Sequence, residues 1–230
     1  MKPASNLAVA DDAAVEAPTI PGTPFGGGFY AGPIALHGKT YALIVAPKAL
    51  GEQSGILWKK NWREATPGTQ SVDDGFANCL AMNDDGHPAA HWARGLRIAG
   101  FDDWYLPARD ELELLYRTLK PGTRENYTYD SRLGWYQVEP GKYNGVDEHG
   151  NGHNASSVPP GDAYTATSPV QTMAEAFREG GAEAFDPRLY WSSTEFDPAF
   201  AWVQNFDVGY QGDFCKTFVL RARAVRKVLI

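Results

Sequence analysis

The feature that most constrains the fold of this chain is a stretch of about 60 residues, 123–188, with almost no hydrophobic periodicity. Tyr, Asn, Gly, His, Ser and Pro dominate this stretch, and only residues 172–179 have the pattern of a short helix. Connections of this length are uncommon in compact domains and usually carry function or lack order. We therefore predict a long insertion in a domain whose regular elements lie on both sides of it.

Segments with regular periodicity flank this stretch. A helix is predicted over residues 110–119, because acidic residues would lie in its first turn and a Pro-Gly pair follows it. Its buried stripe would comprise Leu112, Leu115, Tyr116 and Leu119. A second helix is predicted to begin at Ser71 and to stop before residues 84–88. Strands are predicted at residues 29–36, 40–46, 55–58, 189–193, 199–206, 212–220 and 221–228.

The N-terminal residues have a different character. Three prolines lie within residues 18–24, and Gly26, Gly27 and Gly28 follow them. Such a sequence sustains neither a helix nor a central strand. We predict that residues 1–28 form an extended arm, which orders against a partner or stays a flexible tail, and that residues 29–230 form one domain.

Charge and hydropathy exclude two classes of partner. The net charge is −7 and the pI is about 5.2, so the chain lacks the basic stripe of a nucleic-acid-binding protein. The basic residues near the C-terminus alternate with apolar ones, which predicts the outer face of a closing strand; they are Arg221, Arg223, Arg226 and Lys227. No run approaches the roughly 20 apolar residues that span a bilayer, and no signal peptide is visible. We expect no membrane insertion, and synthesis in a cytoplasm.

Three segments resemble a known family when they are taken in order. They are residues 100–112 (GFDDWYLPARDEL), 190–195 (YWSSTE) and 219–226 (VLRARAVR). Together they resemble the Lcl C-terminal-like domain, which ends certain bacterial collagen-like adhesins and recurs in prophage tail genes. The resemblance covers roughly residues 29–230. It implies an α+β fold similar to C-type lectins, with two helices, a small mostly antiparallel sheet and the long inserted loop.

The residues that carry the resemblance have structural roles in our interpretation. They are Asp103, Trp104, Leu106, Pro107, Tyr190, Trp191 and Arg226. The pre-proline backbone at Leu106 restricts the approach to the helix, and Trp191 can fill the space between helix and sheet. Ala108 stands where the family prefers Ser or Thr. The helix is therefore predicted to lack a side-chain cap, at a cost of about 1 kcal/mol.

The sequence offers little for a metal or a cofactor. Calcium requires six to eight clustered oxygens, and the acidic pairs of this chain match neither an EF-hand loop nor the triplets of calcium-dependent lectins. His149 and His153 flank a glycine-rich segment that will not hold them on a helix. They remain candidates only for a metal on the axis of a symmetric oligomer. We expect no cofactor.

Catalysis has equally little support. Ser192, Ser193 and Thr194 lack the nucleophile elbow and a local His, and no nucleotide-binding fingerprint is present. Cys79 and Cys215 could pair or remain thiols, and a cytoplasmic origin favours thiols. They lack the local arrangement of the formylglycine-generating enzymes, whose fold is related. We predict a protein without catalytic activity, with an enzyme of that type as an alternative.

The best binding candidate is the insertion together with the last hairpin. Its aromatic residues are Tyr127, Tyr129, Trp135, Tyr136, Tyr143, Tyr164 and Tyr210, and they lie among Asn, Gly and Ser. That mixture of rigid rings and adaptable polar groups resembles an antibody paratope. The alternative is that these rings seal an interface between subunits.

The resemblance and the arm suggest a role in a virus particle. We expect a phage or prophage tail or baseplate protein, located in the virion and homotrimeric, that binds a glycan or protein receptor on a bacterial surface. Residues 1–28 would dock on other tail proteins. The alternative is a structural tail or baseplate subunit that uses the same loops for assembly.

Overall fold

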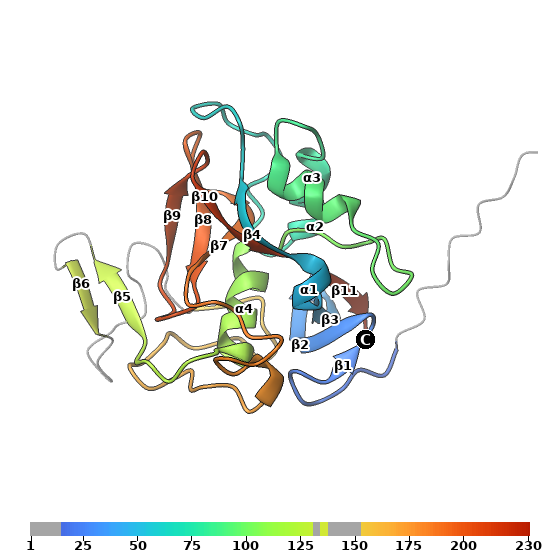
Figure 1. Ribbon diagram of the computed structural model, residues 1–230, viewed down its shortest axis with the longest axis vertical. Helices are drawn as coiled ribbons and strands as arrows, with labels where there is room; N and C mark the ends of the chain where they lie inside the picture. Colours follow the sequence, from blue (N-terminus) through green and yellow to red (C-terminus); the bar gives the residue numbers. More distant parts are fainter. Residues whose placement is uncertain (1–14, 131–133, 138–152) are drawn as a thin grey trace, which may run out of the picture.

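The computed structural model describes residues 15–130, 134–137 and 153–230, with the backbone alone for 127–130 and 134–137. Two sheets enclose helix α4 (Arg109–Leu119), which packs on strands of both (Figure 1). The first sheet has the order β1 (Pro24–Phe25), β2 (Gly28–Leu36), β3 (Lys39–Val45) and β11 (Val225–Leu229). The second has the order β4 (Glu52–Leu57), β10 (Val219–Arg223), β7 (Leu189–Glu195), β8 (Phe200–Asn205) and β9 (Gln211–Cys215). Strands β5 (Tyr127–Asp130) and β6 (Gly134–Gln137) form a separate hairpin.

The architecture confirms the predicted α+β class with mostly antiparallel pairing. Among the described strands, only β10 and β7 pair in parallel. Strand β3 lies between β2 and β11, and its residues Ala42, Leu43, Ile44 and Val45 are fully buried. Apolar residues on both faces of this segment predicted such a central position.

The described chain has four α-helices where two were predicted. The added ones are α1 (Lys48–Gly51) and α3 (Pro88–Gly95). Pro88, taken from the sequence as part of a helix stop, instead opens α3, because a proline fits the first turn where its missing N–H is not needed. The helix predicted from Ser71 is α2 (Gly75–Ala81). It begins later because the Ser71 hydroxyl accepts the Asp74 N–H (2.9 Å) and closes a turn, while Asp74 caps the helix.

The three family-like segments meet in one core. Trp104, Leu106 and Trp191 are fully buried and belong to the same cluster of packed side chains. The backbones of Tyr105 and Val225 exchange two hydrogen bonds of 2.8 and 2.9 Å, and Pro107 accepts the Ser193 N–H (2.7 Å). The structure therefore joins segments that lie far apart in the sequence.

The prediction that the C-terminal basic residues line an outer face is wrong for two of them. Arg223 is fully buried and donates to Ala46 and Glu183, and Arg226 is 6% exposed. The Arg226 guanidinium makes two hydrogen bonds to Asp103 (2.7 and 2.8 Å) and stacks 3.8 Å above the Phe101 ring. These bonds explain why Asp103 and Arg226 both belong to the segments that carry the family resemblance: the two side chains form one ion pair.

The backbone N–H groups at the start of α4 have more hydrogen-bond acceptors than the sequence predicts. Ala108 supplies no side-chain cap, but its own N–H donates to Glu111 (2.8 Å). The next two N–H groups donate to the Thr194 hydroxyl (3.0 Å) and to the Val72 carbonyl (2.8 Å). Acceptors from other segments thus replace the missing Ser or Thr.

Glu195, the last residue of the YWSSTE segment, organises the loop that follows β4. Its carboxylate accepts from the Thr66 backbone (2.8 Å) and the Thr69 hydroxyl (2.9 Å), and pairs with Lys216 at 2.9 Å. The side chains of Glu195 and Lys216 are 3% and 0% exposed. Lys216 lies in the turn that divides the strand predicted over 212–220 into β9 and β10.

Part of the predicted arm packs on the domain. The Val15 N–H donates to Leu229 (3.1 Å), Gly22 and Thr23 exchange hydrogen bonds with Tyr30, and β1 pairs with β2. Residues 15–28 are therefore part of the folded unit, and residues 1–14 lie outside the described part. Within that described part, none of the helices is both long and apolar enough to cross a bilayer.

Candidate functional site

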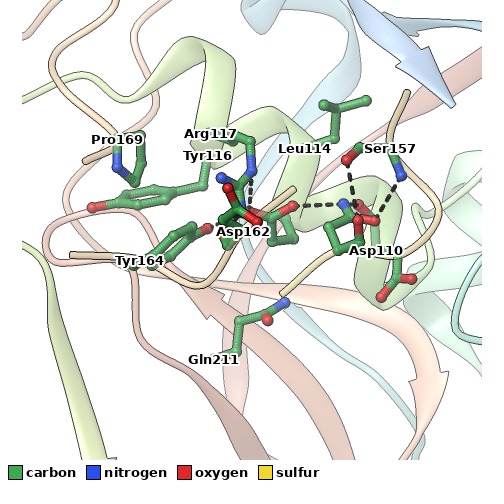
Figure 2. Close-up of polar contacts among 12 residues, drawn as sticks. Asp110, Leu114, Tyr116, Arg117, Ser157, Asp162, Tyr164, Pro169 and Gln211 are labelled. Atoms are coloured by element: carbon green, nitrogen blue, oxygen red, sulfur yellow. Dashed lines mark hydrogen bonds and ion pairs between the residues drawn. The ribbon is translucent and has the colours of Figure 1, made fainter. Parts of the chain in front are cut away.

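A polar stripe on α4 holds the insertion. The stripe consists of polar residues three or four positions apart, which therefore share one side of the helix: Asp110, Glu113 and Arg117, followed by Lys120 just after the last helical residue. Figure 2 shows Asp110 and Arg117 projecting toward the insertion, near Ser157, Asp162 and Tyr164. Asp110, Glu113 and Lys120 are at most 3% exposed. Charged groups so deeply buried need partners, and the insertion supplies them.

Asn154 anchors the C-terminal arm of the insertion. Its amide nitrogen donates to the Asp110 carbonyl (2.8 Å) and to the Glu113 carboxylate (2.5 Å). Its amide oxygen accepts the backbone N–H groups of Ser156 and Ser157, both at 3.0 Å. Since every hydrogen-bonding position of this side chain is used, it fixes the arm against α4.

Glu113 lies at the centre of this contact. It accepts from the Tyr164 hydroxyl (2.7 Å) and pairs with Arg117 (2.9 Å), whose guanidinium also donates to the Asp162 carbonyl (2.9 Å). Burial raises the pKa of Glu113, although Arg117, Tyr164 and Asn154 all favour its ionised form. The donors therefore offset part of the cost of burying a carboxylate.

Asn126 anchors the other arm, at the base of the β5–β6 hairpin. It accepts from the Tyr116 hydroxyl (2.7 Å) and the Lys120 ammonium (2.9 Å), and donates to the carbonyls of Thr165 (2.9 Å) and Pro169 (3.1 Å). Lys120 also donates to the Arg124 carbonyl at 2.6 Å. Burial lowers the pKa of Lys120 to about 8, against the opposing charge of Asp207. Both arms of the insertion are thus tied to one helix.

A groove runs along the anchored insertion, and we call its three adjoining hollows the insert groove. The first hollow, about 460 Å³, includes Thr123, Arg124, Pro169, Val170 and Met173 in its lining. The second, about 110 Å³, shares Thr123 and Arg124 with the first. The third, about 520 Å³, shares Pro187 and Asp207 with the second, and reaches Leu189, Leu220 and Val219 on the second sheet.

The insert groove lies where the insertion meets the loop between β8 and β9, which belongs to the last hairpin. Arg124, from the insertion, pairs with Asp207, from the loop between β8 and β9, where the hollows adjoin. Val170 is 69% exposed and Met173 is 80% exposed beside it. Exposed apolar side chains at a groove are typical of a contact surface.

Two predicted contact residues are corrected by their burial. Tyr164 is 3% exposed because its ring packs on Tyr116 and its hydroxyl binds Glu113. Tyr210 is 9% exposed and packs over Gly212. Both rings are structural parts of the site.

The remaining predicted contact residues are placed less fully. In the hairpin, Tyr129 pairs with Trp135 and Thr128 with Tyr136, and Tyr127 lies in the same strand. The side chains of these residues and the whole of Tyr143 lie outside the described part of the chain. The exposed groove residues Val170 and Met173 were missed, because single apolar residues in an aperiodic stretch give no signal.

The structure describes one of the two histidines that are candidates for a metal site. His153 is exposed and His149 lies outside the described residues. Within the ranges that the structure describes, no group of three His, Cys, Asp or Glu side chains could hold a metal ion.

The thiols and hydroxyls that suggested chemistry have structural roles. Cys79 and Cys215 are free; Cys79 is buried and accepts the Leu106 N–H (3.2 Å), and burial raises its pKa to about 12. A thiol of that pKa is a poor nucleophile at neutral pH. The hydroxyl of Thr194 caps α4, and Ser192 accepts the Thr194 N–H (3.1 Å).

An Asp–His–Thr arrangement that sequence reasoning missed lies near α3. His87 Nδ1 is 2.8 Å from Asp84, and His87 Nε2 is 3.3 Å from the Thr66 hydroxyl. The Lys59 ammonium donates to the same hydroxyl (3.0 Å), which is part of a residue only 5% exposed. These contacts fix the loop after β4.

Comparison with known families adds one finding to this geometry. The sequence matches the family model of the Lcl C-terminal domain over residues 50–226. The match includes α2 to α4, the insertion and the second sheet, and it leaves out β1 to β3, which the predicted range from about residue 29 had included. No curated protein shows significant similarity to the chain.

Proposed function

The chain belongs to the Lcl C-terminal domain family, and from this premise we propose that it is a non-catalytic recognition protein of a phage or prophage tail. It binds a receptor on a bacterial surface through the insertion. Residues of the N-terminal segment dock it on other tail proteins, and the working form in the virion is a homotrimer.

The observation that carries this proposal is the double anchoring of the insertion. Asn126 and Asn154 each use their full hydrogen-bonding capacity between α4 and one arm of the insertion. A surface held in this way loses little conformational entropy when it binds, which favours affinity. The insert groove and the exposed Val170 and Met173 are presented on this rigid support.

A structural role in the tail is the second candidate. The same exposed apolar residues also suit a permanent contact with a neighbouring subunit, since obligate interfaces are rich in apolar groups. Val170 and Met173, which are both exposed at the first hollow of the groove, distinguish the two roles. Replacing both with Asp should abolish adsorption and leave intact particles if the protein recognises a receptor. Loss of particles would support the structural role.

Purification of particles tests the proposal itself. We expect the protein to co-purify with intact virions through a density gradient, in a fixed ratio to the other tail proteins. A protein that stays in the lysate and never accompanies particles would refute a role in the tail.

A further inference from the structure

The lining of the insert groove bears on what kind of molecule it binds. We propose that the groove binds an extended polypeptide segment of a bacterial surface protein, with aliphatic and acidic side chains, and not a glycan chain. This inference rests on the proposed function.

The aromatic groups of the groove argue against a sugar. Sugar-binding sites commonly present a flat ring face to the ligand. Among the described residues that line the three hollows, the rings belong to Phe185 and Phe206, which are 1% and 0% exposed. They stack on each other with centroids 4.0 Å apart. Their faces are therefore occupied by the core.

The aliphatic groups favour a polypeptide. The two end hollows hold Val170 and Met173 at one end and Leu189, Val219 and Leu220 at the other, with the small central hollow between them. Val219 is 64% exposed, so both ends offer accessible aliphatic surface. Successive hollows of this kind suit alternate side chains of an extended chain, which project about 7 Å apart on one face.

The charges of the third hollow indicate an acidic residue in the ligand. Arg188 and Arg221 line this hollow together with Asp207. Arg221 pairs with Glu52 and Asp186, and Asp207 pairs with Arg124. Arg188 is exposed, and in the described part of the chain its guanidinium forms no close salt bridge, although its charge reaches the Asp186 carboxylate, which already pairs with Lys48 and Arg221. The Arg188 guanidinium is thus available to a carboxylate, as a fork that can donate two hydrogen bonds.

Treatment of the cells that the particle infects distinguishes a polypeptide ligand from a glycan ligand. The full chain, fluorescently labelled, is added to intact cells, to cells digested with a broad protease, and to cells oxidised with periodate. We expect protease to reduce binding by at least about tenfold, a loss of about 1.4 kcal/mol, and periodate to leave it unchanged. Any loss after periodate overturns the choice of a polypeptide and leaves the recognition role standing. Absence of binding to untreated cells contradicts the proposed function itself.

Groove variants locate the site. Met173→Asp and Val219→Asp place a charge at exposed aliphatic positions at the two ends, and Arg188→Glu reverses the available cation. Each should weaken binding about tenfold or more. Leu80→Asp is the matched control, because Leu80 is 57% exposed on α2, outside the groove lining. Protease-sensitive binding that survives all three substitutions would show that the groove is not the site and would overturn the inference.

Discussion

At the scale of single residues, the buried pair of Lys216 and Glu195 should be a costly contact to break. Replacing Lys216 with Met leaves the Glu195 carboxylate buried without its cation, and should lower the free energy of unfolding by about 3–5 kcal/mol. The measurement is urea denaturation followed by circular dichroism. The double variant Lys216→Met with Glu195→Gln should lose less than the sum of the two single variants, because they share one interaction. Additive losses would mean that the pair is not coupled.

Lys120 gives the molecule a specific dependence on pH. Burial lowers its pKa to about 8, from an ordinary value of 10.5. Between these two values the unfolded chain keeps a proton that the folded chain has released, so the free energy of unfolding should rise with pH in this window. The rise should be smaller in Lys120→Met, measured by denaturation at about pH 7.5, 8.5 and 9.5. Equal slopes in both proteins would contradict the assigned role of Lys120.

At the scale of elements, the anchors of the insertion can be released one at a time. Asn126→Ala removes four hydrogen bonds at the base of the β5–β6 hairpin, at a cost of about 2–4 kcal/mol. Backbone amides of residues 124–130 and 165–170 should then exchange hydrogen faster than in the unsubstituted protein, while those of β3 should exchange at the same rate as before. Asn83→Ala, at an exposed position, is the control and should leave exchange unchanged. A uniform increase across the domain would mean that the insertion has no separate anchoring.

The elements also show how far sequence reasoning reaches. Helix α4 was predictable from its apolar stripe, because Leu112, Leu115 and Leu119 recur at helical spacing. The burial of its polar stripe could not be predicted, since the spacing of Asp110, Glu113 and Arg117 is equally typical of a solvated face. Only the Asn, Ser and Tyr partners from the insertion, 44 to 51 positions away, decide between the two.

At the scale of the whole molecule, the class of fold followed from segments that meet in space. Residues 100–112, 190–195 and 219–226 predicted one scaffold, and the core around Trp104, Leu106 and Trp191 confirms it. The position of residues 15–28 was not predictable, because the bond from Val15 to Leu229 depends on a partner more than 200 positions away and the short local pairing of β1 with β2 lies in a stretch rich in Pro and Gly. The groove had no sequence signal, since it forms where three separate segments adjoin.

The most direct test of the account is a hydrogen-exchange footprint of the full chain with envelope fragments of the bacterium that the particle infects. The account predicts slower exchange at residues 121–125, 166–173, 187–189, 205–207 and 219–221, with no change in α2 and α3. Slower exchange confined to α2 and α3, or no change along the insert groove, would contradict it.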